Sequence, residues 1–190
     1  MKIKKYILLF LILTFASYFL NVKPNDFYKR GNDFLKNSKK FQKENNLILS
    51  GYGINLNESI ETPERNSIHK FYVTFFSKEK LNLNAAREKL IKSIGNFLAK
   101  INNDVKIRNY IYEYPFNYKG LHFSIAFYSE EGKPRKEKYI HSCTLAENSI
   151  YYKIAYPNGT FKRIHEETYE EALKIVESQK SNKEIKSPSE

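Results

Sequence analysis

Five side chains in the sequence have the chemistry of metal ligands or nucleophiles: Cys143, His69, His122, His141 and His165. Because alternate residues of a strand point to the same side, His141 and Cys143 could share a metal ion or form a nucleophile–base pair. Two ligands are too few for a zinc site, and nothing marks His141 as an activated base. His165 begins no His-Glu-x-x-His motif, since Tyr169 stands where the second histidine belongs. The sequence therefore predicts no metal site, no cofactor and no catalytic residue.

The motifs of common enzyme classes are absent from the sequence as well. It has no glycine-rich phosphate loop, no Gly-x-Ser-x-Gly turn and no convincing pair of spaced carboxylates. An enzyme of unrecognised type would need titratable groups that converge in a pocket, for instance His141, Cys143 and Glu113. A single cysteine also excludes an intramolecular disulfide, so an exported domain would depend on its aromatic core.

Five aromatic residues occupy consecutive even positions of one stretch: Tyr110, Tyr112, Tyr114, Phe116 and Tyr118. In one continuous strand they would form a stacking surface for a sugar, a peptide or a base. Pro115 cannot donate to a strand ladder and disfavours helical geometry before it. We therefore expect a short helix near residues 104–112, a turn, and rings that mostly pack or anchor the loop. Arg108, Tyr112 and Tyr118 are candidate contacts to a partner.

The formal net charge of +11 suggests a nucleic-acid-binding protein until its distribution is considered. Residues 1–46 contain ten Lys/Arg and three Asp/Glu, whereas the remaining residues contain 22 and 18. The basic excess thus belongs mainly to the N-terminal region, and the rest of the chain is almost balanced. We therefore expect no nucleic-acid partner.

Residues 1–22 have the composition of a signal peptide or a transmembrane anchor, with three lysines before an apolar run over residues 6–20. As a helix this run is about 22 Å long, short of the roughly 30 Å hydrocarbon core, which favours a signal peptide. Cleavage after Thr14-Phe15-Ala16 would leave the apolar Ser17–Leu20 on the mature chain, which favours an anchor. Both alternatives stay open. We choose the anchor, with residues 6–20 in the membrane and the domain exported.

The basic composition and the spacing of the apolar residues in 23–46 predict an amphipathic linker helix. Its phenylalanines are spaced seven residues apart: Phe27, Phe34 and Phe41. This aromatic seam could join copies of the chain in a coiled coil or dock the helix on the following domain. Gly31 and Ser38 stand at the alternate seam positions and weaken the coiled coil. Phe34 and Phe41 are further candidate partner contacts, and the basic segment 23–43 is a candidate contact to anionic lipid or an envelope component.

Residues 47–177 have the pattern of a single α+β domain. Alternating apolar residues predict strands at 47–56, 70–77, 121–129, 137–145, 150–156 and, less clearly, 157–164. The clearest helix is Leu83–Ile101 with Asn82 as its cap, and a capping box at Thr168-x-x-Glu171 begins the last helix. The expected fold is an antiparallel sheet of five to six strands with helices packed on one face. Residues 178–190 are expected to form a disordered tail.

Two stretches of the chain carry a resemblance to a known family. The first, Leu81–Phe116, contains Ala86-Arg87-Glu88 at a helix start, "INN" at its end, "KIR-x-Y" and Tyr114-Pro115-Phe116; the second is "TYEEALKIV" at Thr168–Val176. They resemble a family of uncharacterised exported or membrane-anchored proteins of chlamydia-related bacteria. Members carry Pro after the Arg, where Asn109 stands here, and His-Asn before Tyr-Pro-Phe, where Tyr112 and Glu113 stand, so a role of that histidine does not carry over. The resemblance covers roughly half the chain and implies export or anchoring but no known activity.

These observations leave two classes of function. The first is a single-pass protein of the bacterial inner membrane whose exported domain binds a partner or an envelope component without catalysis. The second is a cleaved, periplasmic or secreted protein that acts, like an effector, on a host or neighbouring partner. An enzyme of unrecognised type comes third.

Overall fold

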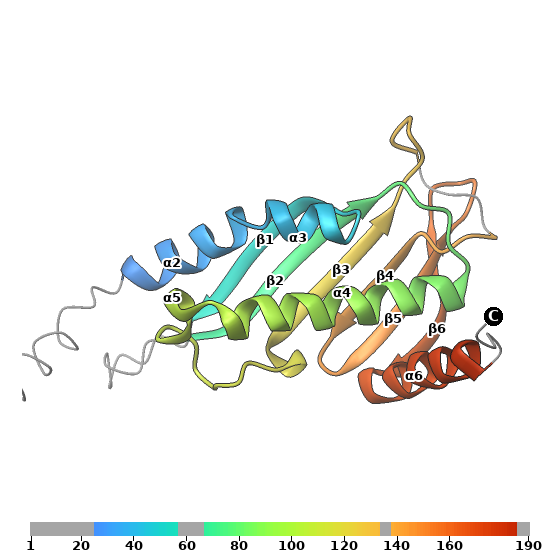
Figure 1. Ribbon diagram of the computed structural model, residues 1–190. Coiled ribbons are helices and arrows are strands. Elements are labelled where there is room, and N and C mark those ends of the chain that lie inside the picture. The colour runs from blue at the N-terminus through green and yellow to red at the C-terminus, as the bar shows by residue number, and fades with distance from the viewer. Residues whose placement is uncertain (1–24, 57–66, 134–137, 186–190) are drawn as a thin grey trace, which may run out of the picture.

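The computed structural model describes residues 25–56, 67–133 and 138–185. Six strands form one sheet in chain order: β1 (Ile48–Leu56), β2 (Ile68–Ser77), β3 (Leu121–Phe127), β4 (Ser142–Ala146), β5 (Ser149–Ala155) and β6 (Phe161–Thr168). The helices are α2 (Asn25–Lys36), α3 (Lys39–Glu44), α4 (Leu83–Asn103), α5 (Val105–Arg108) and α6 (Tyr169–Ile185), with a 3-10 turn, η2 (Tyr118–Gly120). Figure 1 shows the helices on one face of the sheet, which is the predicted α+β architecture.

The predicted signal peptide or anchor, residues 1–22, lies outside the described residues, as do residues 23 and 24 of the predicted linker. Within the part of the chain that the structure describes, no helix is long and apolar enough to cross a membrane.

The sheet is mixed, which corrects the prediction that it is antiparallel. β2 and β3 run parallel, with Phe71 opposite Leu121 and Ser77 opposite Phe127, while the other neighbouring strands are antiparallel. The parallel pair arises because α4 and the segment after it carry the chain back along the sheet before β3 begins. Alternation of apolar residues is the same for both strand directions, so the sequence pattern could not distinguish them.

The core lies between one face of the sheet and the helices. β3 buries every second residue, so that Phe123, Ile125 and Phe127 point into the core while Ser124 and Ala126 are partly exposed. On the helical side, Phe97 of α4 packs edge-on against Phe123 with 5.7 Å between the ring centroids. Contacts of this kind bury large aromatic areas, which is the main stabilising contribution open to a domain without disulfides.

α4 confirms the helix predicted from the apolar stripe. Asn82 Oδ1 accepts a hydrogen bond from Ala85 N at 3.0 Å, so the predicted cap is formed. Buried residues recur along the helix at 3.6-residue spacing: Ala86, Leu90, Ile94, Phe97 and Ile101. The short helix predicted after α4 is present as α5, although it covers only Val105–Arg108.

The last helix begins at the predicted capping box. Thr168 N donates to Glu171 Oε2 at 2.8 Å, and Glu171 N donates to Thr168 Oγ1 at 3.2 Å. The prediction of disorder after residue 177 is wrong for residues 178–185, which continue α6. Residues 186–190 lie outside the described residues.

The segment predicted as a linker helix forms α2 and α3, which pack into the core. Phe41 is 4% exposed, and its ring centroid lies 5.4 Å from that of Phe75 in β2. Gly31 lets α2 approach the sheet closely, because a Cβ atom at this position would lie only 2.8 Å from Ile54 Cδ1. These contacts agree with a helix that docks on the domain, and the core therefore includes residues before 47.

Candidate functional site

The aromatic residues of the even-numbered run divide between the core and the surface. Phe116 is 5% exposed, and Tyr110 packs edge-on against Phe27 of α2 with 5.2 Å between ring centroids. Tyr112 and Tyr114, by contrast, are 64% and 50% exposed. The rings therefore form no single stacking surface, as the position of the proline indicated.

Tyr112 and Tyr114 belong to a surface that we call the α2–α5 end. Figure 1 shows the start of α2 beside α5 at one end of the molecule. The surface consists of exposed residues from the first two turns of α2 and from segment 105–114: Tyr28, Lys29, Arg30, Val105, Lys106, Arg108, Asn109, Tyr112, Glu113 and Tyr114. Val105, at 69%, and Tyr112 are the two most exposed large apolar side chains among the described residues. Apolar and aromatic groups are thus combined with four basic side chains and one acidic side chain, that of Glu113.

Specific contacts fix the exposed rings of the α2–α5 end. Tyr112 stacks on His69 with 3.9 Å between the ring centroids. The guanidinium carbon of Arg108 lies 4.4 Å from the centroid of Tyr114, and the Tyr114 hydroxyl donates to Asn102 O at 3.4 Å. The two tyrosines are therefore presented to solvent in a defined orientation.

Beside Tyr112 lies a hollow of about 170 Å³, lined by His69, Tyr112, Glu113, Phe116, Asn117, Lys119 and Gly120. His69 Nε2 is buried and has no hydrogen-bond partner among the described residues. Burial lowers the pKa of His69, so its imidazole is neutral at pH 7. The hollow is therefore lined by a neutral imidazole ring together with the charged side chains of Lys119 and Glu113.

Of the five predicted partner contacts, the structure brings Arg108 and Tyr112 together on the α2–α5 end. Tyr118 lies apart from them, because its ring stacks on Tyr169 at 4.2 Å between centroids and its hydroxyl donates to Glu170. This hydrogen bond raises the pKa of Tyr118 to about 12.

The other two predicted contacts, Phe34 and Phe41, are 5% and 4% exposed. Contact of these rings with a partner is not compatible with their burial, and this prediction is corrected. The reason is that an aromatic stripe at helical spacing looks the same whether it faces another chain or the sheet of its own domain.

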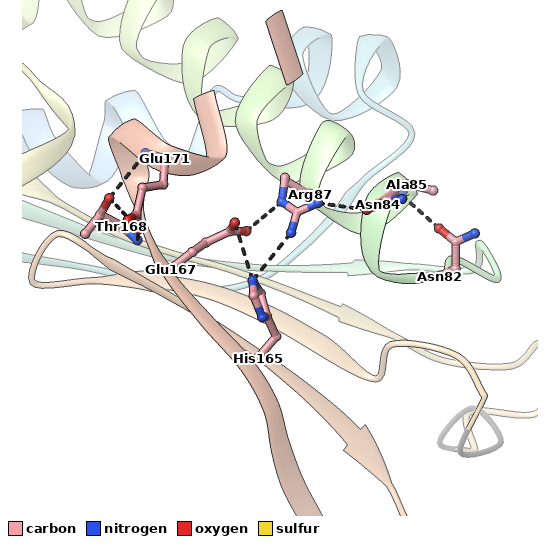
Figure 2. A network of polar contacts seen from close by, with 8 residues as sticks. All are labelled: Asn82, Asn84, Ala85, Arg87, His165, Glu167, Thr168 and Glu171. Carbon is pink, nitrogen blue, oxygen red and sulfur yellow. Dashed lines mark hydrogen bonds and ion pairs between the residues drawn. The ribbon is translucent and has the colours of Figure 1, made fainter. Parts of the chain in front are cut away.

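A second cluster, drawn in Figure 2, is buried between α4 and β6. Arg87 Nε donates to Glu167 Oε1 at 2.7 Å, and the two side chains are 6% and 5% exposed. His165 Nε2 lies 3.5 Å from Arg87 Nη2 and 3.5 Å from Glu167 Oε2. Asn84 Oδ1 accepts from Arg87 Nη1 at 2.8 Å. Each buried charge thus has a hydrogen-bonded partner, which is the condition for keeping it inside a fold.

The Arg87 cluster joins distant parts of the chain. Arg87 and Glu167 are 80 residues apart, and the guanidinium carbon lies 5.9 Å from the ring centroid of Tyr152 in β5. Burial, and then the neighbouring Glu167, raise the pKa of Tyr152. Arg87 and Glu167 line neither the hollow beside Tyr112 nor the second hollow, between α3 and α4, that is described below. We therefore interpret the cluster as a link that holds α4 to the sheet.

The sequence contains a signal for this cluster that the apolar pattern alone did not reveal. Arg87 stands within the apolar stripe of α4, four residues after Leu83 and three before Leu90. A charged residue at a core-facing position predicts a buried ion pair, because an unpaired charge there would be costly. The partner, Glu167, could be identified only from the three-dimensional structure.

A second hollow, of about 320 Å³, lies between α3 and the first turns of α4 and includes Asn45, Asn46, Glu79 and Lys89 among its lining residues. Lys89 Nζ lies 2.6 Å from Glu79 Oε2 and donates to Asn45 O at 2.9 Å. Asn46 Nδ2 donates to Glu79 Oε1 at 3.1 Å. These four residues bind one another, so they attach α3 to α4.

The residues named for a hypothetical catalytic site do not come together. Glu113 lines the hollow beside the start of β3, whereas His141 contacts Tyr128, one residue beyond the end of β3, at 5.2 Å between ring centroids. A strand of this length spans about 20 Å. Cys143 is fully buried, and burial raises the pKa of its thiol. Among residues 25–56, 67–133 and 138–185, no group of three His, Cys, Asp or Glu side chains could hold a metal ion.

Comparison of the chain with protein-family models, with curated proteins and with solved structures found no match.

Proposed function

We propose that this protein is a domain of the bacterial inner membrane, anchored by residues 6–20 and exported, that binds a partner or an envelope component without catalysis. The observation that carries the proposal is how soon the fold begins after the apolar run. Phe27, seven residues after Leu20, already packs against Tyr110 in the domain. An anchor so close to the first core residue would hold the domain directly at the membrane, with no stalk between them.

A binding role is supported by the distribution of reactive groups. Glu113 and His141 lie at opposite ends of β3, and Cys143 is enclosed. Arg108 and Tyr112, in contrast, are exposed on one surface and are held by ring contacts. We propose them as partner contacts. The resemblance of Leu81–Phe116 to exported or anchored proteins of chlamydia-related bacteria bears on the proposed export and anchoring, and it implies no activity.

The alternative is a protein that is cleaved and then secreted to act on a host or neighbouring partner. It differs from the anchored protein in one measurable property, the presence of residues 1–20 in the mature chain. Cleavage after Ala16 would leave Ser17–Leu20, an apolar stretch, in front of α2. We prefer the anchor because a soluble protein would gain nothing from that stretch.

The test is the intact mass of the chain in membrane and soluble fractions after expression in a bacterial host. A mass of 22.5 kDa in the membrane fraction supports the anchor. A shortened chain in the soluble periplasmic fraction contradicts it and supports the secreted alternative. Orientation is tested on the same cells, since trypsin added to intact spheroplasts cleaves the Lys-rich α6 only if the domain is exported.

A further inference from the structure

We infer that the α2–α5 end lies in the headgroup layer of the bilayer, where Val105, Tyr112 and Tyr114 enter the interface and the surrounding basic side chains meet anionic phospholipid. This inference rests on the proposed anchoring by residues 6–20. It adds which surface of the domain faces the membrane and which lipid chemistry that surface requires.

The length of the connecting chain limits where the membrane can be. Asn25, the first described residue, is five residues after Leu20, the last residue of the apolar run. Five extended residues span at most about 17 Å. The start of α2 therefore stays within that distance of the bilayer, and α5 lies beside the start of α2 (Figure 1). The opposite end of the sheet, where His141 and Phe161 stack, is farther from the tether.

The side chains of the α2–α5 end fit a membrane interface. Tyrosine is enriched at this depth, because its ring is apolar and its hydroxyl remains hydrated. Val105 and Tyr112 are 69% and 64% exposed, the highest exposed fractions among the large apolar side chains of the described residues. Burial of these two side chains in the interface would recover the apolar contact area that the fold leaves open.

The charge of this surface favours anionic lipid. Its basic residues come from two separate elements: Lys29, Arg30, Lys106 and Arg108. The acidic residues of the same two stretches, 25–30 and 104–114, are Asp26, Glu113 and Asp104, whose carboxylate caps α5 by accepting from Lys106 N at 2.8 Å. Each basic side chain near an anionic membrane contributes about 1 kcal/mol of attraction. Four basic residues stand against three acidic ones, a net charge of +1, so we expect a modest preference of this surface for phosphatidylglycerol over phosphatidylcholine.

The absence of tryptophan from the sequence allows a direct test with the full chain. The variants Tyr112→Trp and Phe161→Trp each introduce one fluorescent reporter, and Phe161 is a matched control because it is 51% exposed at the start of β6, where it stacks on His141 away from the α2–α5 end. Each variant is reconstituted in phosphatidylglycerol vesicles with or without lipid brominated near the headgroup. We expect brominated lipid to lower the emission of the Tyr112→Trp variant roughly twofold and to leave the Phe161→Trp variant unchanged. Vesicles of phosphatidylcholine should give weaker quenching.

The outcomes separate this inference from the proposed function. If the chain floats with the vesicles but the two variants are quenched equally, or neither is quenched, the anchor holds and the inference is overturned. If the chain does not float with the vesicles, both are contradicted. Circular dichroism verifies the fold of each variant, and Tyr114→Trp replaces Tyr112→Trp if the latter does not fold.

Discussion

At the scale of single residues, two neighbouring glutamates of β6 hold arginines in opposite environments. Glu167 pairs with Arg87 inside the core, where the two side chains are 5% and 6% exposed. Glu166 pairs with Arg163 at the surface, where they are 45% and 53% exposed. Burial, and not the presence of an ion pair, should decide how much each glutamate matters for stability, because water screens the exposed pair.

This contrast predicts different effects of the same substitution. Glu167→Ala leaves Arg87 charged and enclosed, so we expect the free energy of unfolding to fall by about 3–5 kcal/mol. Glu166→Ala should lower it by less than about 1 kcal/mol. Urea-induced unfolding followed by circular dichroism measures both. Equal losses in the two variants would contradict the structural role of the Arg87 cluster.

Glu79 gives a prediction for the dependence of stability on pH. Burial raises the pKa of its carboxyl, but hydrogen bonds from Lys89 and Asn46 and the charge of Lys89 outweigh this, so the pKa lies below its ordinary value of 4.5. A carboxyl with a lowered pKa in the folded state stabilises the fold above its unfolded pKa, and the contribution disappears as the pH falls through the folded pKa. We expect Glu79→Gln to lower the free energy of unfolding by about 1 kcal/mol at pH 7. The difference from the unchanged chain should disappear as the pH falls below 4.5 and through the lowered pKa of Glu79; a difference independent of pH would rule out the ionised pair as its cause.

At the scale of elements, glycines in two helices provide a matched comparison. A Cβ atom at the exposed Gly95 of α4 would meet no neighbouring group within 4 Å, whereas a Cβ at Gly31 of α2 would lie 2.8 Å from Ile54 Cδ1. Gly95→Ala should raise the free energy of unfolding by about 0.5–1 kcal/mol through helix propensity. The change in the free energy of unfolding caused by Gly31→Ala should be about 1–3 kcal/mol less favourable than that caused by Gly95→Ala, because the methyl group overpacks the contact between α2 and β1. Thermal unfolding of both variants tests this difference. Equal shifts in melting temperature would show that α2 and β1 are not in close contact at Gly31.

The elements that were predicted well are those whose signals are local. The stripe and cap of α4 and the capping box before α6 depend on residues within a few positions of one another, and both were found from the sequence. The direction of β3 relative to β2 depends on the path of the chain between residues 78 and 120, for which no local pattern exists. The same limit applies to the candidate site. Arg108 and Tyr112 were recognised from one stretch of the sequence, whereas only the three-dimensional structure showed that this stretch lies beside the start of α2.

At the scale of the whole molecule, α2 and α3 belong to the domain. They contribute four apolar residues with exposures of 9% or less to the core: Phe27, Phe34, Leu35 and Phe41. Burial of four such side chains is worth roughly 6–12 kcal/mol, which is comparable with the whole stability of a domain of this size.

A chain that begins at residue 21 should therefore unfold cooperatively, whereas one that begins at residue 47 should not. Circular dichroism with increasing urea distinguishes the two, since only a packed domain gives a sharp transition. The shorter chain would disprove the assignment of α2 and α3 to the core if it unfolded at the same urea concentration as the longer one.

The parallel pairing of β2 with β3 also determines the order in which the sheet can assemble. All strand pairs join consecutive strands, but the connection between β2 and β3, residues 78–120, is the longest, so Phe71 meets Leu121 only after this segment has been made and folded back. Closing a long loop has an entropic cost that local hairpins avoid, so this seam should form last. During synthesis the chain emerges residue by residue, and its N-terminal half would wait with the β2 edge unpaired. Amide hydrogen exchange during refolding should therefore find the protons of β1–β2 and of β4–β6 protected before those that cross from β2 to β3.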